Sequence, residues 1–190
     1  MAVTATNLIQ GPASLYVGDF GETEPADTAV ASAPGGDWTD MGGTQDGVRL
    51  IINQEYTELE VDQVVDVPGR RLTKRDVQVA TNLAEPTLDN LTYVLNGGAV
   101  TSGGTGGTAY EAYDPAMDNS ATQPTYHALL LDGWAPNGKQ RRVIVRKVLS
   151  VESVESAYKK DEQTLWPVTF AAHWVSTSIK PFHIVDSTAA

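Results

Sequence analysis

The strongest pattern in the chain is an alternation of apolar and polar side chains, which is clearest at residues 55–62. Successive side chains of a strand point to opposite faces, so every second residue lies on the same side. One side of this segment is largely apolar: Thr57, Leu59 and Val61. The other side is acidic: Glu58, Glu60 and Asp62, with Tyr56 beside them. We expect a half-buried strand here, whose apolar side packs against a core.

The same alternation predicts further strands joined by turns. Residues 123–151 form a predicted hairpin around the turn at 136–139. Residues 166–174 (WPVTFAAHW) predict a core strand, in which Pro167 favours a place near an edge or at a strand start. Shorter strands are expected near 14–17, 48–52 and 77–81.

One segment has helical spacing instead. Its apolar residues recur on one helical face: Leu88, Leu91, Val94 and Leu95. Pro86 stands where a first helical turn would begin, and Gly97 and Gly98 would end the helix. These signals predict a helix over residues 86–96.

Other segments have no regular apolar pattern. The glycine-rich stretch 97–107 predicts a flexible loop, because glycine loses the most backbone freedom when it is held in one conformation. Residues 19–37, 62–76 and 176–190 are mostly polar or rich in glycine and proline, and we expect extended loops or arms. A basic cluster lies in the second of these loops: Arg70, Arg71, Lys74 and Arg75.

The order of these elements indicates one domain over residues 1–190. Its 190 residues suffice for a single core. We expect a mainly β fold, an antiparallel β-sandwich or open barrel with one flanking α-helix.

Composition narrows the classes of function. The net charge is −11, so the surface as a whole repels the phosphates that a DNA-binding protein must neutralise. The chain has no cysteine, which excludes disulfides, thiolate metal sites and a cysteine nucleophile. No apolar run reaches the roughly 18 residues needed to cross a bilayer, so we expect no membrane insertion.

Candidates for catalysis are few, and we expect neither an enzyme nor a bound metal or other cofactor. The histidines, His127, His173 and His183, lack the spacing of a metal-binding motif, and a role in hydrogen bonding accounts for them. The acidic row of Glu58, Glu60 and Asp62, together with Glu55, has carboxylates at a separation that glycoside hydrolases use. Such enzymes also need an apolar cleft that tunes one carboxylate, and only Tyr56 shares this face. A solvated strand face is the ordinary alternative.

Four segments in order carry a resemblance to a known family: 11–18 (GPASLYVG), 38–48 (WTDMGGTQDGV), 54–63 (QEYTELEVDQ) and 83–88 (LAEPTL). Together they resemble the major tail proteins, or tail-tube proteins, of long-tailed bacteriophages (siphophages). The resemblance implies a tail-tube-like fold and rings, hexameric in the family, that stack around a channel. It also implies a location in the virion, after assembly in the cytoplasm of the bacterial host.

The resemblance gives the acidic and basic clusters expected roles. Glu58, Glu60 and Asp62 would face the lumen and repel DNA in transit, which passes without specific binding. The basic residues would contact an adjacent subunit or ring, as would the loops at 19–37, 62–76 and 176–190. Expected partners are further copies of the chain, the tape-measure protein, the tail terminator and tail-tip proteins. The alternative is a capsid decoration protein or another virion-associated β-sandwich binding module, which would not polymerise.

Overall fold

The computed structural model describes residues 3–116 and 119–188, and most of its strands belong to one bent antiparallel sheet. The strand order is β2-β1-β7-β8-β9-β4-β3, and β10 also pairs with β8. The strands are β1 (Ser14–Asp19), β2 (Thr39–Asp40), β3 (Thr44–Leu59), β4 (Gly69–Leu83), β7 (His127–Ala135), β8 (Lys139–Ser150), β9 (Trp166–Ala172) and β10 (Phe182–Asp186). The prediction of a mainly antiparallel β fold with a helix beside it is confirmed.

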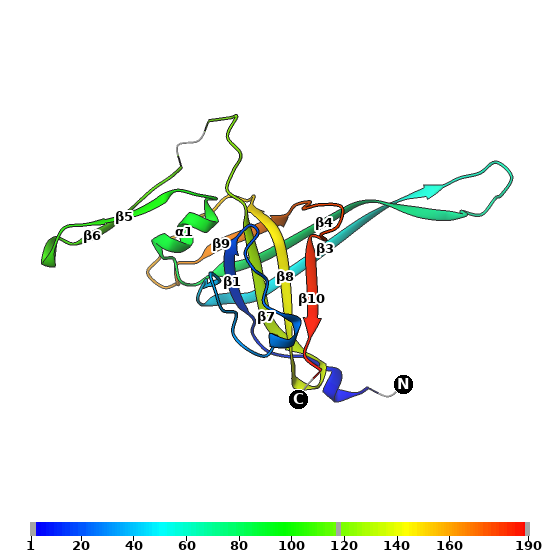
Figure 1. Ribbon diagram of the computed structural model, residues 1–190, viewed down its shortest axis with the longest axis horizontal. Helices are drawn as coiled ribbons and strands as arrows, with labels where there is room; N and C mark the ends of the chain where they lie inside the picture. The colour runs from blue at the N-terminus through cyan, green and yellow to red at the C-terminus, as the bar shows by residue number, and fades with distance from the viewer. Residues whose placement is uncertain (1–2, 117–118, 189–190) are drawn as a thin grey trace.

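The sheet bends around one main core. In Figure 1, β1, β7, β8 and β10 cross the line of β9, β4 and β3. Side chains from both parts meet in a single buried cluster, in which Leu15, Val79, Leu129 and Phe170 are fully buried. Burying these apolar surfaces together stabilises the bend, because it removes both inner faces from water.

The helix α1 (Leu88–Val94) lies within the predicted range of 86–96 but is shorter at both ends. Thr87 caps it, because its side-chain oxygen accepts a hydrogen bond from the backbone N–H of Asn90 (3.2 Å). The helix ends before Asn96, whose φ of 56° leaves the right-handed helical region. Val94 packs into the main core, so the helix closes one end of it.

Segment 19–37 is held against the sheet, although the sequence predicted a poorly anchored loop. It contains only the short 3₁₀ helix η2 (Asp27–Ala29). Arg142 of β8 is 1% exposed, forms an ion pair with Asp132 (2.7 Å), and donates hydrogen bonds to the carbonyl oxygens of Ala29 and Ser32. The segment is a loop as expected, and it is anchored because a buried arginine satisfies backbone carbonyls that the loop would otherwise present to water.

The C-terminal segment folds back and contains a strand, where the sequence predicted an extended loop or arm at 176–190. Residues 182–186 form β10 beside β8, and Arg141 binds the Asp186 carboxylate with two hydrogen bonds (2.6 and 2.7 Å). Strand β8 therefore has one edge shared by two partners, β10 at 141–145 and β9 at 148–150. Residues 189–190 of the predicted arm lie outside the described residues.

The glycine-rich stretch 97–107, predicted as a flexible loop, forms the first strand and part of the turn of a β-hairpin. Strands β5 (Ala99–Gly103) and β6 (Tyr110–Asp114) pair around the 3₁₀ helix η3 (Gly106–Thr108). The hairpin projects from the α1 side of the molecule (Figure 1). Its second strand begins at Tyr110, after the last glycine of the stretch. The glycine-rich composition of the first strand gave no sign that it pairs with this segment.

Candidate functional site

The feature that dominates the molecule is the hairpin of β3 and β4. Near the body its side chains enter the core, with Val77, Val79 and Leu83 buried. Beyond residues 52 and 77 the two strands leave the body and extend as an arm (Figure 1). We call residues 52–76, with the connecting loop 60–68, the projecting hairpin.

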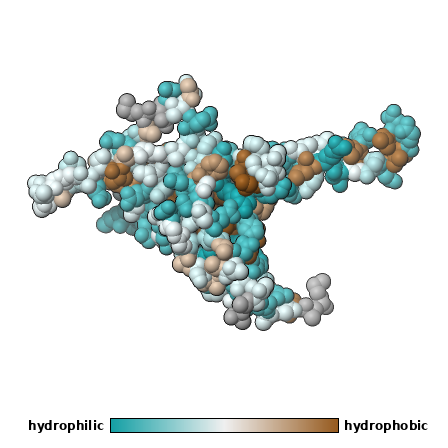
Figure 2. Space-filling view, viewed as in Figure 1, coloured by the Kyte–Doolittle hydropathy of each residue, from teal (hydrophilic) through white to brown (hydrophobic). Residues whose placement is uncertain are grey.

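Apolar side chains of the projecting hairpin are exposed. All of the following are at least 40% exposed: Ile52, Tyr56, Leu59, Val61, Val64, Val65, Val67 and Leu72. Figure 2 shows brown apolar side chains scattered along this arm among hydrophilic ones. The prediction that Leu59 and Val61 pack against a core was therefore wrong, because both side chains lie exposed on a hairpin that projects from the body.

The pairing of β3 with β4 decides which side chains share a face. Directly paired residues of antiparallel strands project to the same side. Tyr56 pairs with Leu72 and Glu58 pairs with Arg70 on one face. The register shifts between Glu55 and Tyr56, where the strand opposite carries an extra residue. Such a bulge increases the local twist of the arm.

The four basic residues lie on β4, whereas the sequence placed them in a loop. Arg70 forms an ion pair with Glu58 (2.5 Å), and Lys74 lies 3.5 Å from Glu55. Arg71 pairs in register with Thr57, and Arg75 with Gln54. The loop prediction was wrong because Pro68-Gly69 ends the turn and starts β4, so the strand begins before the basic cluster.

The acidic row divides into two parts. Glu58 belongs to β3 and has Arg70 as a partner, so part of its charge is neutralised. Strand β3 ends at Leu59, so Glu60 follows the strand and Asp62 lies in the turn beyond it. No ion pair within the described ranges involves Glu60, Asp62 or Asp66, so the unpaired negative charge is concentrated toward the tip of the arm.

The outer edge of β3 is the second unusual feature. In the part of the chain that the structure describes, β3 pairs with β4 alone, so one edge of a 16-residue strand has no strand partner. An exposed, extended edge offers unpaired N–H and C=O groups to another chain. The projecting hairpin therefore combines apolar side chains with a free edge.

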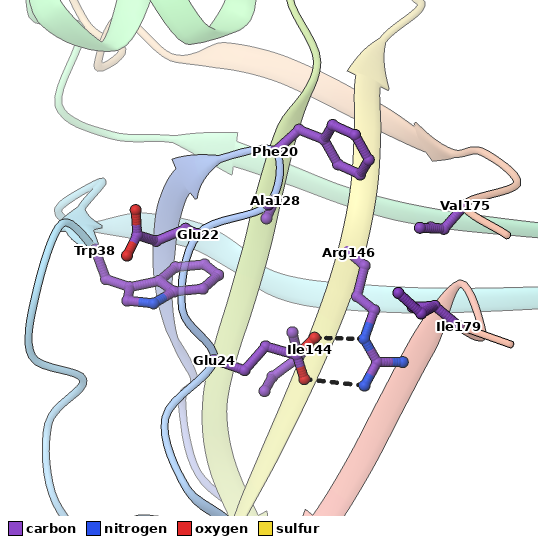
Figure 3. A pocket seen from close by; sticks show the side chains of 10 residues that line it. Phe20, Glu22, Glu24, Trp38, Ala128, Ile144, Arg146, Val175 and Ile179 are labelled. Carbon is purple, nitrogen blue, oxygen red and sulfur yellow. Dashed lines mark hydrogen bonds and ion pairs between the residues drawn. The ribbon is translucent and has the colours of Figure 1, made fainter.

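A shallow hollow lies on the face of β7 and β8 that is turned away from the main core. It has a volume of about 210 Å³ and is lined mainly by apolar groups, including Phe20, Trp38 and Ile144 (Figure 3). Its charged residues are Glu22, Glu24 and Arg146, and the last two bind each other through two hydrogen bonds (2.5 and 2.9 Å). This pairing raises the pKa of Arg146, chiefly through the hydrogen bond to Glu24.

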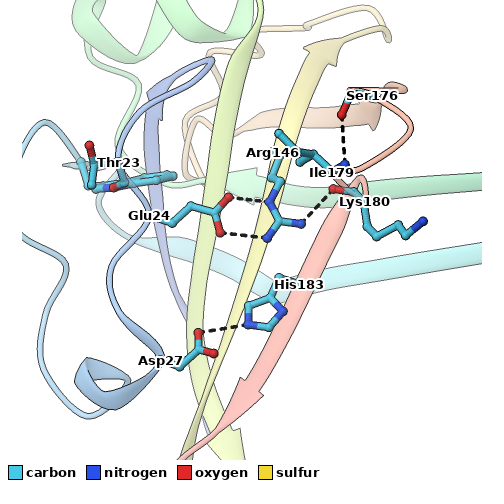
Figure 4. Close-up of polar contacts among 9 residues, drawn as sticks. Thr23, Glu24, Asp27, Arg146, Ser176, Ile179, Lys180 and His183 are labelled. Carbon is cyan, nitrogen blue, oxygen red and sulfur yellow. Dashed lines mark hydrogen bonds and ion pairs between the residues drawn. The ribbon is translucent and has the colours of Figure 1, made fainter.

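The ion pair also ties three segments together. Besides binding Glu24, Arg146 donates to the carbonyl oxygen of Lys180 (2.9 Å). His183 of β10 lies 3.1 Å from Asp27 of η2 (Figure 4). These contacts attach segment 19–37 to β8 and to the C-terminal segment 176–186. Glu24, Arg146 and His183 therefore have a structural role in this chain.

The buried histidine is His127, whose ring nitrogens have no hydrogen-bond partner among the described residues. Its ring packs edge-on against Tyr93, with the centroids 5.2 Å apart. Burial lowers the pKa of His127, and the Asp19 carboxylate at 3.7 Å opposes this only weakly because it is 86% exposed to water. His173 has a lowered pKa as well, through burial and the nearby charge of Lys147.

No metal-binding arrangement is present within residues 3–116 and 119–188, where no three His, Asp or Glu side chains converge suitably. No helix in the same ranges is long and apolar enough to cross a membrane. The buried Arg142 and the free edge of β3 were not predicted from the sequence. Nothing in the sequence distinguishes Arg142 from Arg141. The length of the β3–β4 hairpin, in contrast, could have been predicted from the strand pattern on both sides of residues 60–68.

Comparison with known proteins gave no further assignment. No protein-family model matches the chain, and no curated protein matches it. The site is therefore defined by its own geometry, which is that of a projecting hairpin with exposed apolar side chains and one free strand edge.

Proposed function

We propose that the chain is a structural subunit of a bacteriophage tail tube, with a tail-tube-like fold, that assembles into stacked and hexameric rings around a channel for DNA. The observation that carries the proposal is the projecting hairpin. An isolated two-stranded ribbon with apolar groups exposed on it has little stability of its own. Contact with further copies would cover those groups and pair the free edge of β3.

The charges of the arm support a role in a conduit. Glu58, Glu60 and Asp62 would face the lumen, where a ring repeats each of them in every subunit. Like charges lining a narrow channel repel phosphates and keep DNA from binding. Among the described residues, no cation lies within ion-pair distance of the acids beyond Leu59, which leaves them the larger share of this repulsion.

The basic residues of β4 have a second proposed role. Arg70 and Lys74 already pair within the hairpin, while Arg71 and Arg75 are paired in register with uncharged residues. Arg71 and Arg75 are therefore the two with charge available for a carboxylate on an adjacent subunit or ring. The partners of the assembly would be the tape-measure protein, the terminator and the tail-tip proteins, in a virion built in the host cytoplasm.

Electron microscopy of the purified chain in negative stain tests the proposal. We expect rings or tubes with an open centre. A variant whose loop 60–68 is replaced by a two-residue Asn-Gly turn should keep the circular dichroism spectrum of the parent, because this loop contributes no buried side chain, and should fail to assemble.

The matched control shortens the other projecting hairpin. Replacing residues 104–109 between β5 and β6 by the same turn should leave tubes intact, since the assembly is assigned to the β3–β4 arm. Monomers or trimers of the parent chain at high concentration would contradict the proposal. They would instead favour a capsid decoration protein or another virion-associated binding module.

A further inference from the structure

We propose that Asn137 is a site of spontaneous deamidation in the folded protein, and that the structure protects Asn96, the first residue of the other Asn-Gly pair. The sequence contains two such pairs, Asn96-Gly97 and Asn137-Gly138. They are chemically equivalent in an unfolded chain, so any difference between them comes from the fold.

The reaction needs a mobile side chain and an accessible backbone nitrogen. The nitrogen of the following glycine attacks Cγ of asparagine, a new N–Cγ bond forms, the Cγ–Nδ2 bond breaks and ammonia leaves with the amide proton. Water then opens the resulting succinimide at either carbonyl. The products are aspartate, or isoaspartate with the main chain lengthened by a methylene. Glycine favours the attack because it has no side chain to hinder the approach.

Asn137 meets these requirements. It stands at the tip of the β7–β8 turn in the left-handed region (φ 64°, ψ 28°), and Gly138 follows with φ 69°. A side chain built on Gly138 would find no atom within 4 Å, so the surroundings are open. Asn137 is exposed, and its side chain has no hydrogen-bond partner among the described residues.

Three hydrogen bonds that the reaction would have to break hold the Asn96 side chain and the backbone nitrogen of Gly97. Its side-chain nitrogen donates to the carbonyl oxygen of Ser150 (2.8 Å), and its side-chain oxygen accepts from the Ser150 N–H (2.8 Å). The attacking nitrogen, that of Gly97, already donates to the carbonyl oxygen of Thr92 (2.8 Å). Both the electrophile and the nucleophile are therefore fixed by the fold.

The modification would change one end of the molecule. The 3₁₀ helix η1 (Ala5–Asn7) lies against the turn η4 (Pro136–Gly138) that contains Asn137. Next to the turn, the side chain of Lys139 donates to the carbonyl oxygen of Thr188 (2.7 Å). Deamidation adds a negative charge where both terminal segments contact the body, and it alters the turn without entering the core.

Peptide mapping by mass spectrometry tests the proposal on the intact chain. A protease that cuts after acidic residues separates the two sites, since Asp89 and Glu111 flank Asn96 while Asp132 and Glu152 flank Asn137. After incubation at mildly alkaline pH, we expect Asn137 to convert at least about tenfold faster than Asn96, because each hydrogen bond that must open slows the reaction. In denaturant the two sites should convert at similar rates.

Two variants sharpen the test. Gly138→Ala should slow conversion at position 137. Ser150→Pro removes the backbone N–H that donates a hydrogen bond to the Asn96 side-chain oxygen, and it should speed conversion at position 96. If Ser150→Pro does not fold, the rate of conversion of Asn96 in the native parent can be compared with its rate in denaturant. That comparison also measures how far the fold protects Asn96. Equal native rates at the two sites, or conversion at Asn96 alone, would overturn the proposal. An unchanged Asn137 under conditions that convert it in denaturant would overturn it too.

Discussion

Two adjacent arginines of β8 have very different surroundings. Arg142 is buried, bound to Asp132, and donates to the carbonyl oxygens of segment 19–37, whereas Arg141 pairs with Asp186 near the surface. Strand alternation places neighbours on opposite faces, which is the physical origin of the difference. The basic cluster at 70–75 could be predicted from the sequence. The burial of Arg142 could not, because the backbone carbonyls that it binds are distant in the chain.

We predict that Arg142→Met lowers the free energy of unfolding by about 3 kcal/mol, because the Asp132 charge and two carbonyl oxygens lose their partner. The neighbouring variant Arg141→Met should cost about 1 kcal/mol or less, since it removes a partly exposed ion pair. Urea unfolding of both variants measures the difference. Equal losses would show that Arg142 does not hold the segment.

The histidines predict a pH dependence of stability. Burial lowers the pKa of folded His127 below its ordinary value of 6.5, so near that pH the unfolded chain binds more protons than the folded one. Stability is therefore full above pH 6.5 and is lost as the pH falls toward the folded pKa. His173 contributes in the same direction.

Thermal unfolding at a series of pH values checks this. We expect the midpoint to fall below pH 6.5 in the parent and to fall less in His127→Phe, which keeps the ring against Tyr93. The Arg141 hydrogen bond lowers the pKa of Asp186, so that pair loses its contribution only as the pH falls below about 3.8. The two effects occupy separate pH ranges. An unchanged slope in His127→Phe would show that another group causes the dependence.

At the scale of elements, the projecting hairpin carries exposed apolar side chains that the core does not need. Tyr56 and Leu72 form a cross-strand pair with both side chains exposed. We predict that the double variant Tyr56→Ser, Leu72→Ser changes the free energy of unfolding by only about 0.5 kcal/mol, as exposed sites do. Sedimentation should nevertheless show a strong loss of assemblies, because the pair is proposed to be covered by another copy.

The control for this variant is Tyr158→Ser. Tyr158 is 85% exposed on the loop between β8 and β9, away from the arm. Its loss should change neither folding nor assembly. Assemblies that persist in the double variant at parental yield would mean that the hairpin is not the contact.

Strand pattern predicted most elements but not their partners. The hairpin at 123–151 and the strand at 166–174 were found because their apolar side chains enter this chain's own core. Pattern misled at 55–62, since the exposed residues of the projecting hairpin alternate like residues that pack inside the chain. It also missed β10 and β6, whose residues are only partly buried and carry a weak apolar signal.

At the scale of the whole molecule, the proposed position of the acidic row predicts whether assembled tubes bind DNA. Tubes of the parent chain should not bind short double-stranded DNA. We predict that the triple variant Glu58→Lys, Glu60→Lys, Asp62→Lys binds it, with an affinity that falls steeply as salt rises. A filter-binding assay on assembled tubes measures this. Binding that stays absent in the variant would indicate that these residues lie away from any DNA-accessible surface.

Both described ends of the chain contact the same turn. Helix η1 lies against η4, and the carbonyl oxygen of Thr188 accepts a hydrogen bond from Lys139 beside it. Figure 1 shows the two ends together, away from both projecting hairpins. A short linker could therefore join them, and new ends could be opened in the exposed stretch 155–163 between β8 and β9. The order of the elements along the chain would change, while every strand pair stayed the same.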